Sequence, residues 1–230
     1  MTTSRQIMSR GARTLEDYYI EGATDAVPYT TTKDWKRAGE VVARAFEKNA
    51  YNLFVTQHCS IEQNIADFQH RCQELVENNT LILEADDFAA VAVWIPPEWD
   101  YYPYPDPIDP NLRFAEDAFH QCAEKFFKGG PFWHLTMLAK DPLRPEVKGA
   151  TSKVMKPVLE DAKRRNIPAA LECIDERARE IYEYYGFKTY ETITVGAGKC
   201  NPQGYEEEGG QGIKVYYMIY NYDPKVNPVL

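Results

Sequence analysis

The sequence predicts a single mixed α/β domain that contains one parallel pair of strands. Its 230 residues are 44% hydrophobic, which is enough to bury one sizeable core and short enough for one domain. Apolar residues recur at helical spacing in some segments and form short strand-like runs in others, and the two kinds alternate along the chain. We expect the domain to span residues 26–230, after a flexible N-terminal leader at residues 1–25.

Two helices and three strands are predicted in the first part of the chain. Asp34 is a suitable N-cap for a helix whose apolar residues recur at helical spacing from Trp35 to Phe46. A second helix is predicted over Ile61–Glu77, because its apolar residues share one face. The predicted strands are Ala26–Thr31, Leu81–Glu84 and Ala89–Ile95, the last two joined as a hairpin by Asp86 and Asp87.

The segment Trp99–Pro110 contains three tyrosines and four prolines. Proline fixes φ and removes a backbone donor, so the segment is neither a regular helix nor a central strand. It is either a packed surface loop or an aromatic wall over a substrate site. The apolar residues from Leu112 to Phe126 then predict a helix, which ends at Gly129 and Gly130.

The second half of the chain alternates strands and helices. A strand at Trp133–Lys140, a helix at Gly149–Arg165 and a strand at Ala169–Ile174 form a unit in which the strands pair in parallel. A helix at Glu176–Tyr185 follows and ends at Gly186. The last two predicted strands, on either side of a polar, glycine-rich connection, are Lys188–Val195 and Ile213–Asn221.

Composition narrows the class of partner. The net charge of −9 argues against nucleic acid, which needs a basic surface, and favours a neutral or cationic small molecule. No apolar run reaches the ~20 residues of a membrane helix, so no membrane partner is expected. The five cysteines are widely spaced and show no metal-ligand pattern, which favours reduced thiols in a cytoplasmic protein without a metal. We expect a monomer or a homodimer.

The stretch from Trp133 to Phe187 carries the most information. A strand ending in Asp141-Pro142 leads through a basic loop into a helix, then into the strand IPAALECID and a helix that closes on Tyr185-Gly186-Phe187. This order of parts resembles the coenzyme A-binding half of the GCN5-related N-acetyltransferases (GNAT), in particular their puromycin-acetyltransferase-like and fungal branch. Val91–Pro97 also resembles that branch's third strand. The resemblance implies a central mixed, mostly antiparallel sheet of about seven strands with helices on both faces.

The resemblance also implies a site for acetyl-CoA. The family's Q/R-x-x-G-x-G/A loop corresponds to residues 146–151, where Gly149 keeps its place while Glu146 and Thr151 depart from the pattern. The helix N-terminus behind this loop offers N–H groups and a positive dipole end to the pyrophosphate. The strand Leu135–Ala139 would separate from its neighbour and pair with the pantetheine arm. The implied cofactor-binding residues are Leu138, Ala139, Arg144, Val147, Lys148, Gly149, Ala150, Thr151, Ser152, Asp175, Ala178 and Tyr182.

Three residues are candidates for the chemistry. Tyr182 lies seven residues after Asp175, where the family keeps a tyrosine that protonates the departing thiolate; by spacing alone it is equally a core aromatic. Glu172 is the first candidate for the general base, because burying a carboxylate inside an apolar strand costs free energy unless the carboxylate is paired with another polar group or serves in catalysis. His134 is the second, and a structural hydrogen bond explains either residue equally well. Cys173 is expected in the core.

Three functions stay open at this point. The first is acetyl transfer from acetyl-CoA to an amine or hydroxyl of a small molecule, directly in a ternary complex. The second is a GNAT-fold protein that has lost this transfer, since Glu146 and Asp175 place negative charge where the cofactor approaches. The third is a protein-directed acetyltransferase, which needs an open peptide groove; the tyrosine- and proline-rich segment favours a covered pocket instead.

Overall fold

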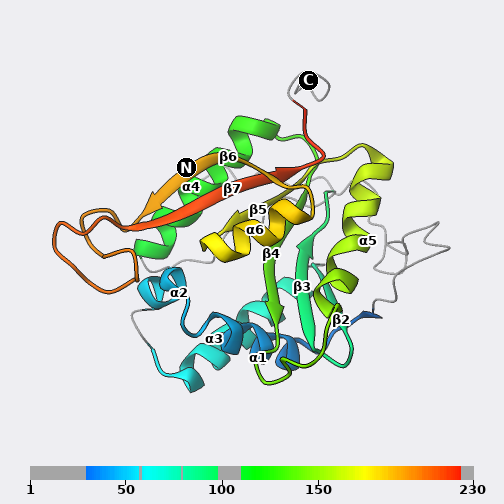
Figure 1. The fold of residues 1–230 in the computed structure, drawn as a ribbon, viewed down its shortest axis with the longest axis horizontal. Helices are drawn as coiled ribbons and strands as arrows, with labels where there is room; N and C mark the ends of the chain where they lie inside the picture. The colour runs from blue at the N-terminus through cyan, green and yellow to red at the C-terminus, as the bar shows by residue number, and fades with distance from the viewer. Residues whose placement is uncertain (1–29, 57–58, 79, 98–109, 224–230) are drawn as a thin grey trace, which may run out of the picture.

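The structure is a computed structural model, and it describes residues 30–56, 59–78, 80–97 and 110–223 (Figure 1). The expected leader at residues 1–25 lies outside the described residues, as does the tyrosine- and proline-rich segment up to residue 109. Both therefore stay predictions.

The described chain forms one seven-stranded sheet, in the order β1-β2-β3-β4-β5-β7-β6. Only β4 and β5 pair in parallel, and all other neighbours are antiparallel. The predicted mixed, mostly antiparallel sheet is therefore confirmed, with strand ends shifted by one or two residues at most where both ends are described. The strands are β1 (Thr30–Thr31), β2 (Leu81–Ala85), β3 (Ala90–Ile95), β4 (Trp133–Lys140), β5 (Ala169–Cys173), β6 (Lys188–Val195) and β7 (Ile213–Tyr220).

Six helices surround the sheet in the part of the chain that the structure describes. Five of them match the sequence prediction; α2 does not, because six residues are too few for helical periodicity to show. None of these helices is both long enough and apolar enough to cross a membrane. They are α1 (Trp35–Phe46), α2 (Ala50–Val55), α3 (Ile61–Glu77), α4 (Pro110–Phe127), α5 (Ala150–Arg165) and α6 (Glu176–Tyr184).

The helices cover both faces of the sheet. On one face, α5 and α6 pack on a core that includes Trp94, Leu135 and Leu171. On the other face, α1 and α3 pack on the β2–β4 half, and α4 packs on Ala170 and Tyr217 in the β5–β7 half. Figure 1 shows α6 over β4 and β5, with α4 behind β6 and β7. Two separate groups of helices therefore cover this second face, α1 and α3 on one side of the β4–β5 junction and α4 on the other.

A glycine sets the distance between α1 and α3. A Cβ atom on Gly39 would lie 2.6 Å from the backbone N and Cα atoms of Gln69. The two helix backbones thus approach closely at this point, and α1 and α3 pack tightly together beside β4.

Candidate active site

The parallel strands β4 and β5 separate after three residues. Trp133, His134 and Leu135 pair with Ala169, Ala170 and Leu171, and the pairing stops there. The rest of β4 keeps its antiparallel partner β3 on one side only. The expectation that this strand would separate from its neighbour is confirmed, and an open strand edge runs from Thr136 to Lys140.

A β-bulge lies at the point of separation. Along β4, Leu135 pairs with Trp94 and Met137 pairs with Val93, so that Thr136 is an extra residue between them. Thr136 therefore has no ladder partner in β3 or β5. Its hydroxyl is buried and, within the described ranges, has no hydrogen-bond partner. We call the point where β4 and β5 separate the fork. The polar side chain of Thr136 and the unpaired backbone of β4 thus meet at the fork.

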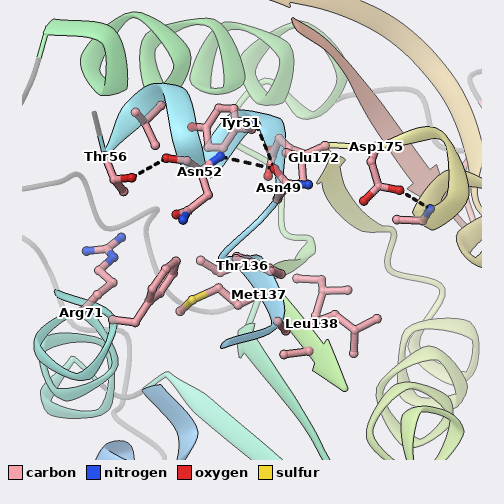
Figure 2. A pocket seen from close by; sticks show the side chains of 18 of the residues that line it. Asn49, Tyr51, Asn52, Thr56, Arg71, Thr136, Met137, Leu138, Glu172 and Asp175 are labelled. Atoms are coloured by element: carbon pink, nitrogen blue, oxygen red, sulfur yellow. Dashed lines mark hydrogen bonds between the residues drawn. The ribbon is translucent and has the colours of Figure 1, made fainter. Parts of the chain in front are cut away.

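A cavity of about 800 Å³ passes through this fork. Its walls come from α1, α2, α3 and α4 on one face of the sheet and from α6 on the other, with β4 and β5 between them. Figure 2 shows Thr136, Met137 and Leu138 on one side of the space and Asn52 and Glu172 across from them. The volume is within the range of small-molecule sites.

The two candidate bases, His134 and Glu172, lie together in the wall of this cavity. His134 Nε2 is 2.8 Å from Glu172 Oε2, and their side chains are only 7% and 12% exposed. Burial by itself lowers the pKa of His134, but the charge and hydrogen bond of Glu172 outweigh it, and the pKa of the imidazole is raised. A buried, hydrogen-bonded pair of this kind can accept a proton from a bound ligand.

Tyr182 lines the cavity from α6. Its ring is partly buried on the core and packs edge-on against Phe187, with 5.9 Å between the ring centroids. Burial, together with the nearby Cys173 and Asp175, raises the pKa of the Tyr182 hydroxyl above its ordinary value. The phenol therefore stays protonated at neutral pH. Cys173 is buried, as expected, and burial raises the pKa of its thiol to about 12.

Five of the expected cofactor residues line the cavity, namely Leu138, Ala139, Asp175, Ala178 and Tyr182. Asp175 is the N-cap of α6, and its carboxylate accepts a hydrogen bond of 2.7 Å from the Ala178 backbone N–H. The positive end of the helix dipole partly offsets the charge of Asp175. The Asp175 carboxylate therefore caps α6 at the edge of the cavity, and its negative charge is hydrogen-bonded to the first turn of that helix.

The remaining expected cofactor residues lie at the start of α5, outside the cavity lining. Gly149 is the N-cap of α5, has a φ of +79° and provides no side-chain hydrogen bond, whereas α1, α2, α3 and α6 all begin with a side-chain cap. A Cβ atom on Gly149 would have no atom within 4 Å. The first N–H groups of α5, at Ala150 and Thr151, thus face a region without a capping side chain.

Several side chains of this loop bind other parts of the chain. Arg144 Nη1 donates to the carbonyl oxygens of Asp86 at 2.7 Å and Asp87 at 2.6 Å. Lys148 Nζ donates to the carbonyl oxygen of Pro145 at 3.1 Å. Two more loop residues face the protein: the Ser152 and Tyr185 hydroxyls share a hydrogen bond of 2.8 Å, and Val147 packs on the core.

Many residues of the cavity lining were not identified as site residues from the sequence, among them Arg71, Thr136, Lys140 and Arg177. Arg71 had a visible signal, because it lies on the apolar face of α3, three residues after Phe68 and four before Leu75. The bulge at Thr136 has no sequence signal. Lys140 and Arg177, which line the cavity beside the cofactor strand and α6, look like ordinary surface cations in the sequence.

The sequence comparisons identify an acetyltransferase-related segment. Residues 30–100 match the family model described as the YOR012W acetyl transferase domain. The putative increased recombination centers protein 11 of Saccharomyces cerevisiae is 38% identical over 95 residues, which are 41% of this chain and 61% of that protein. The chain therefore spans about three fifths of the length of this relative, which agrees with the fungal side of the resemblance.

The solved structures identify the fold. The C-terminal condensation domain of Ebony, in complex with beta-alanyl-dopamine, has a TM-score of 0.61 at 12% identity and covers 84% of this chain and 97% of its own. Arylalkylamine N-acetyltransferase 2 from Aedes aegypti has a TM-score of 0.56 at 16% identity, with coverages of 84% and 97%. These similarities and the fork between β4 and β5 show that the chain has the fold of these two proteins, and the matched segment relates residues 30–100 to an acetyltransferase domain.

Proposed function

We propose that the protein transfers an acetyl group from acetyl-CoA to an amine, or a hydroxyl, of a small molecule, directly in a ternary complex. The observation that carries the proposal is the cavity through the fork, which has the His134–Glu172 pair and the phenol of Tyr182 in its wall. The arylalkylamine N-acetyltransferase of Aedes aegypti shares the fold, and its name supports an amine as the acceptor.

The residues present fit coenzyme A. The open edge of β4 from Thr136 to Lys140 has free backbone groups for an extended, amide-containing arm. The uncapped start of α5, with Gly149 in the left-handed conformation and space around it, suits a pyrophosphate. Lys140 and Arg177 line the cavity and add positive charge, and Lys140 Nζ also donates a hydrogen bond of 3.0 Å to the carbonyl oxygen of Pro145. The exposed carboxylate of Glu146 opposes this, but solvent screens it.

The chemistry follows from the position of the polar groups. Bound acetyl-CoA would supply the acetyl group as a thioester, and the C–N bond to the acceptor forms as the C–S bond breaks. The His134–Glu172 pair takes the proton that the acceptor nitrogen loses. Tyr182, whose phenol is protonated at neutral pH, donates a proton to the departing sulfur.

Calorimetry with coenzyme A and acetyl-CoA tests this function. We expect a Kd in the micromolar range, roughly −7 to −8 kcal/mol. Gly149→Val should weaken binding by about 30-fold or more, because the new side chain occupies the space in front of the first N–H groups of α5. Gly198→Val is the matched control: Gly198 has the same φ of +79° and the same open surroundings, but lies in the β6–β7 connection. Equal affinity for the two variants would show that the cofactor does not bind at α5.

A second function has one observation in its favour. The cations Arg144 and Lys148, which are the expected donors of the loop, hydrogen-bond to carbonyl oxygens of this chain. A GNAT-fold protein that has lost acetyl transfer and binds another ligand in the same cavity is consistent with these contacts. Calorimetry that detects no heat and no competition at millimolar cofactor would rule out the first function and favour the second.

A further inference from the structure

Two buried asparagines form a hydrogen-bonded chain in the wall of the cavity. Asn52 on α2 is 5% exposed and Asn64 on α3 is 2% exposed, and both line the cavity. Asn52 Nδ2 donates to Asn64 Oδ1 at 3.3 Å, and Asn64 Nδ2 donates to the backbone carbonyl oxygen of Ala43 on α1 at 3.0 Å. The two side-chain amides thus connect α2 through α3 to α1.

The carbonyl group at the end of this chain sets the direction of both amides. A carbonyl oxygen only accepts hydrogen bonds, so Asn64 must turn its Nδ2 group to Ala43 and its Oδ1 atom to Asn52. Asn52 must then donate with Nδ2, and in the part of the chain that the structure describes no group donates to its Oδ1 atom. Figure 2 shows the Asn52 side chain extending from α2 into the space of the cavity. The cavity therefore contains a hydrogen-bond acceptor whose orientation is fixed.

Hydrogen bonds on both sides of Asn52 hold its backbone in place. Its N–H donates to the side chain of Asn49, the N-cap of α2, at 3.3 Å, and its carbonyl oxygen accepts from the Thr56 hydroxyl at 2.7 Å. The β6–β7 connection packs directly on the first turn of α2, where a Cβ atom on Gly204 would overlap the Ala50 carbonyl group. An acceptor that is held in place before a ligand arrives binds it with a smaller loss of entropy.

Aromatic side chains line the cavity on the same face of the sheet as Asn52. Tyr51 packs against Phe119 with 6.2 Å between the ring centroids, and Phe46 packs against Phe68 with 5.8 Å. Apolar surface of a ligand is stabilised against such walls, whereas a polar group that leaves water there needs a hydrogen-bond partner. A ligand with an apolar body and one hydrogen-bond donor therefore complements this part of the cavity.

From this arrangement we propose that Asn52 determines the specificity for the acceptor, which is an amine with an apolar body that carries a hydroxyl at its far end. The hydroxyl donates to Asn52 Oδ1 while the amine faces His134 and Glu172. The inference rests on the proposed acetyl transfer, because it places the reacting amine at the fork. An acceptor without the hydroxyl would cover Asn52 Oδ1 without giving it a hydrogen bond, and this loss weakens binding.

A second ammonium group is the alternative donor to Asn52. The side chains that hydrogen-bond to Asn52 are two amides and one hydroxyl, so none of them carries a charge. Burying an ammonium beside neutral groups costs more free energy than burying a hydroxyl. The carboxylates of Asp67 and Glu116 line the cavity and favour an ammonium, but Asp67 is exposed and Glu116 is only half-buried, so water weakens their effect. The neutral surroundings of Asn52 therefore favour the hydroxyl.

Amines that differ only in the donor group test the proposal. Suitable pairs are tyramine with phenethylamine and serotonin with tryptamine. O-methyltyramine keeps the oxygen of tyramine but cannot donate, and para-aminomethylphenethylamine replaces the hydroxyl by a second ammonium. Acetyl-CoA-dependent thiol release gives kcat and KM for each amine, and saturation-transfer NMR gives binding with and without coenzyme A. We expect the hydroxylated member of at least one pair to have the lower KM and Kd, by about 10-fold, and the other two amines to lack this advantage.

Variants of Asn52 separate recognition of the hydroxyl from a loss of structure. Asn52→Leu, which is similar in size, should raise the KM and Kd of the hydroxylated member about 10-fold more than those of its partner. Asn52→Asp keeps an acceptor oxygen and should retain part of the preference. Asn78→Leu is the control, because the Asn78 side chain also donates a hydrogen bond, of 2.8 Å to the Glu74 carbonyl oxygen on α3, but does not line the cavity. It should leave the preference unchanged.

The outcomes are distinct. The proposal would be overturned by the absence of a preference for the hydroxyl in both pairs, by O-methyltyramine or the diammonium amine binding as well as tyramine, or by a preference that persists in Asn52→Leu. If Asn52→Leu does not fold, the wild-type comparison and Asn52→Asp decide. If coenzyme A does not bind while hydroxylated amines bind through Asn52, the recognition of the hydroxyl stands and acetyl transfer does not.

Discussion

Replacing Tyr182 by phenylalanine removes the one hydroxyl that the proposed mechanism assigns to the leaving thiolate. We expect Tyr182→Phe to lower kcat by about 100-fold, a typical contribution of one general acid. The affinity for coenzyme A should be nearly unchanged, because the ring that lines the cavity remains. The loss then falls on kcat and on kcat/KM together, which is the signature of an interaction made in the transition state.

The structure also sets the expected cost in stability. The Tyr182 ring packs on the core and against Phe187, and phenylalanine keeps those contacts. The substitution therefore changes the free energy of unfolding by less than about 1 kcal/mol. If the residue served only as a core aromatic, removal of its hydroxyl would leave turnover unchanged.

The matched control is Tyr184→Phe, two residues further along α6. Tyr184 is 80% exposed and does not line the cavity. Both variants are measured by thiol release on an accepted amine, by calorimetry with coenzyme A and by urea unfolding. Turnover within twofold of wild type in Tyr182→Phe would refute the acid role, and an equal loss of kcat in Tyr184→Phe would point to a general effect on α6.

Three further predictions concern the fork and the helix pair beside it. Because the pKa of His134 is raised in the folded protein, its pair with Glu172 stabilises the fold below a pH of about 6.5, and this contribution is lost as the pH rises through the folded-state pKa. The difference in unfolding free energy between wild type and Glu172→Gln should therefore be larger at pH 6 than at pH 9. A difference that does not change with pH would contradict this expectation. Thr136→Val removes a buried hydroxyl that has no hydrogen-bond partner within the described ranges, so the melting temperature should stay equal or rise; a marked fall would reveal a partner. An alanine in place of a helical glycine stabilises a helix by about 1 kcal/mol where there is room for its Cβ atom. In Gly39→Ala that atom would lie 2.6 Å from the backbone of α3, so we expect urea unfolding to show a free energy of unfolding that is lower by about 2 kcal/mol.

The fold was predictable because its elements have strong local signals. The helix cap at Asp34, the hairpin at Asp86 and Asp87, and the strand–helix–strand order all appear as expected, and the helix predicted from Gly149 begins one residue later, at Ala150. The helix α5 also continues through Pro157, which is buried within it. Local rules suffice for these elements because each depends on residues close in sequence.

The site was predictable only in part, for a physical reason. Glu172 and His134 were separate candidates in the sequence, and only the register of the three paired positions of β4 and β5 brings them within 2.8 Å. The bulge at Thr136 depends on the pairing of β3 with β4, which are far apart in sequence. The register between strands that are far apart in sequence leaves no local pattern in the sequence. The sequence therefore indicated that His134 and Glu172 were candidates, but not that the two side chains form a pair.

The two groups at the fork divide the proposed proton transfer between them. A free amine is largely protonated at neutral pH and must lose a proton before it attacks. In the proposed reaction Glu172 attracts the ammonium form, and the imidazole of His134, 2.8 Å from the Glu172 carboxylate, is placed to take that proton. Glu172→Gln removes the charge that raises the pKa of His134. We therefore expect the pH profile of kcat to move to lower pH in Glu172→Gln, because the imidazole then loses its own proton at a lower pH. An unchanged kcat profile in this variant would contradict the assignment of His134 as the base.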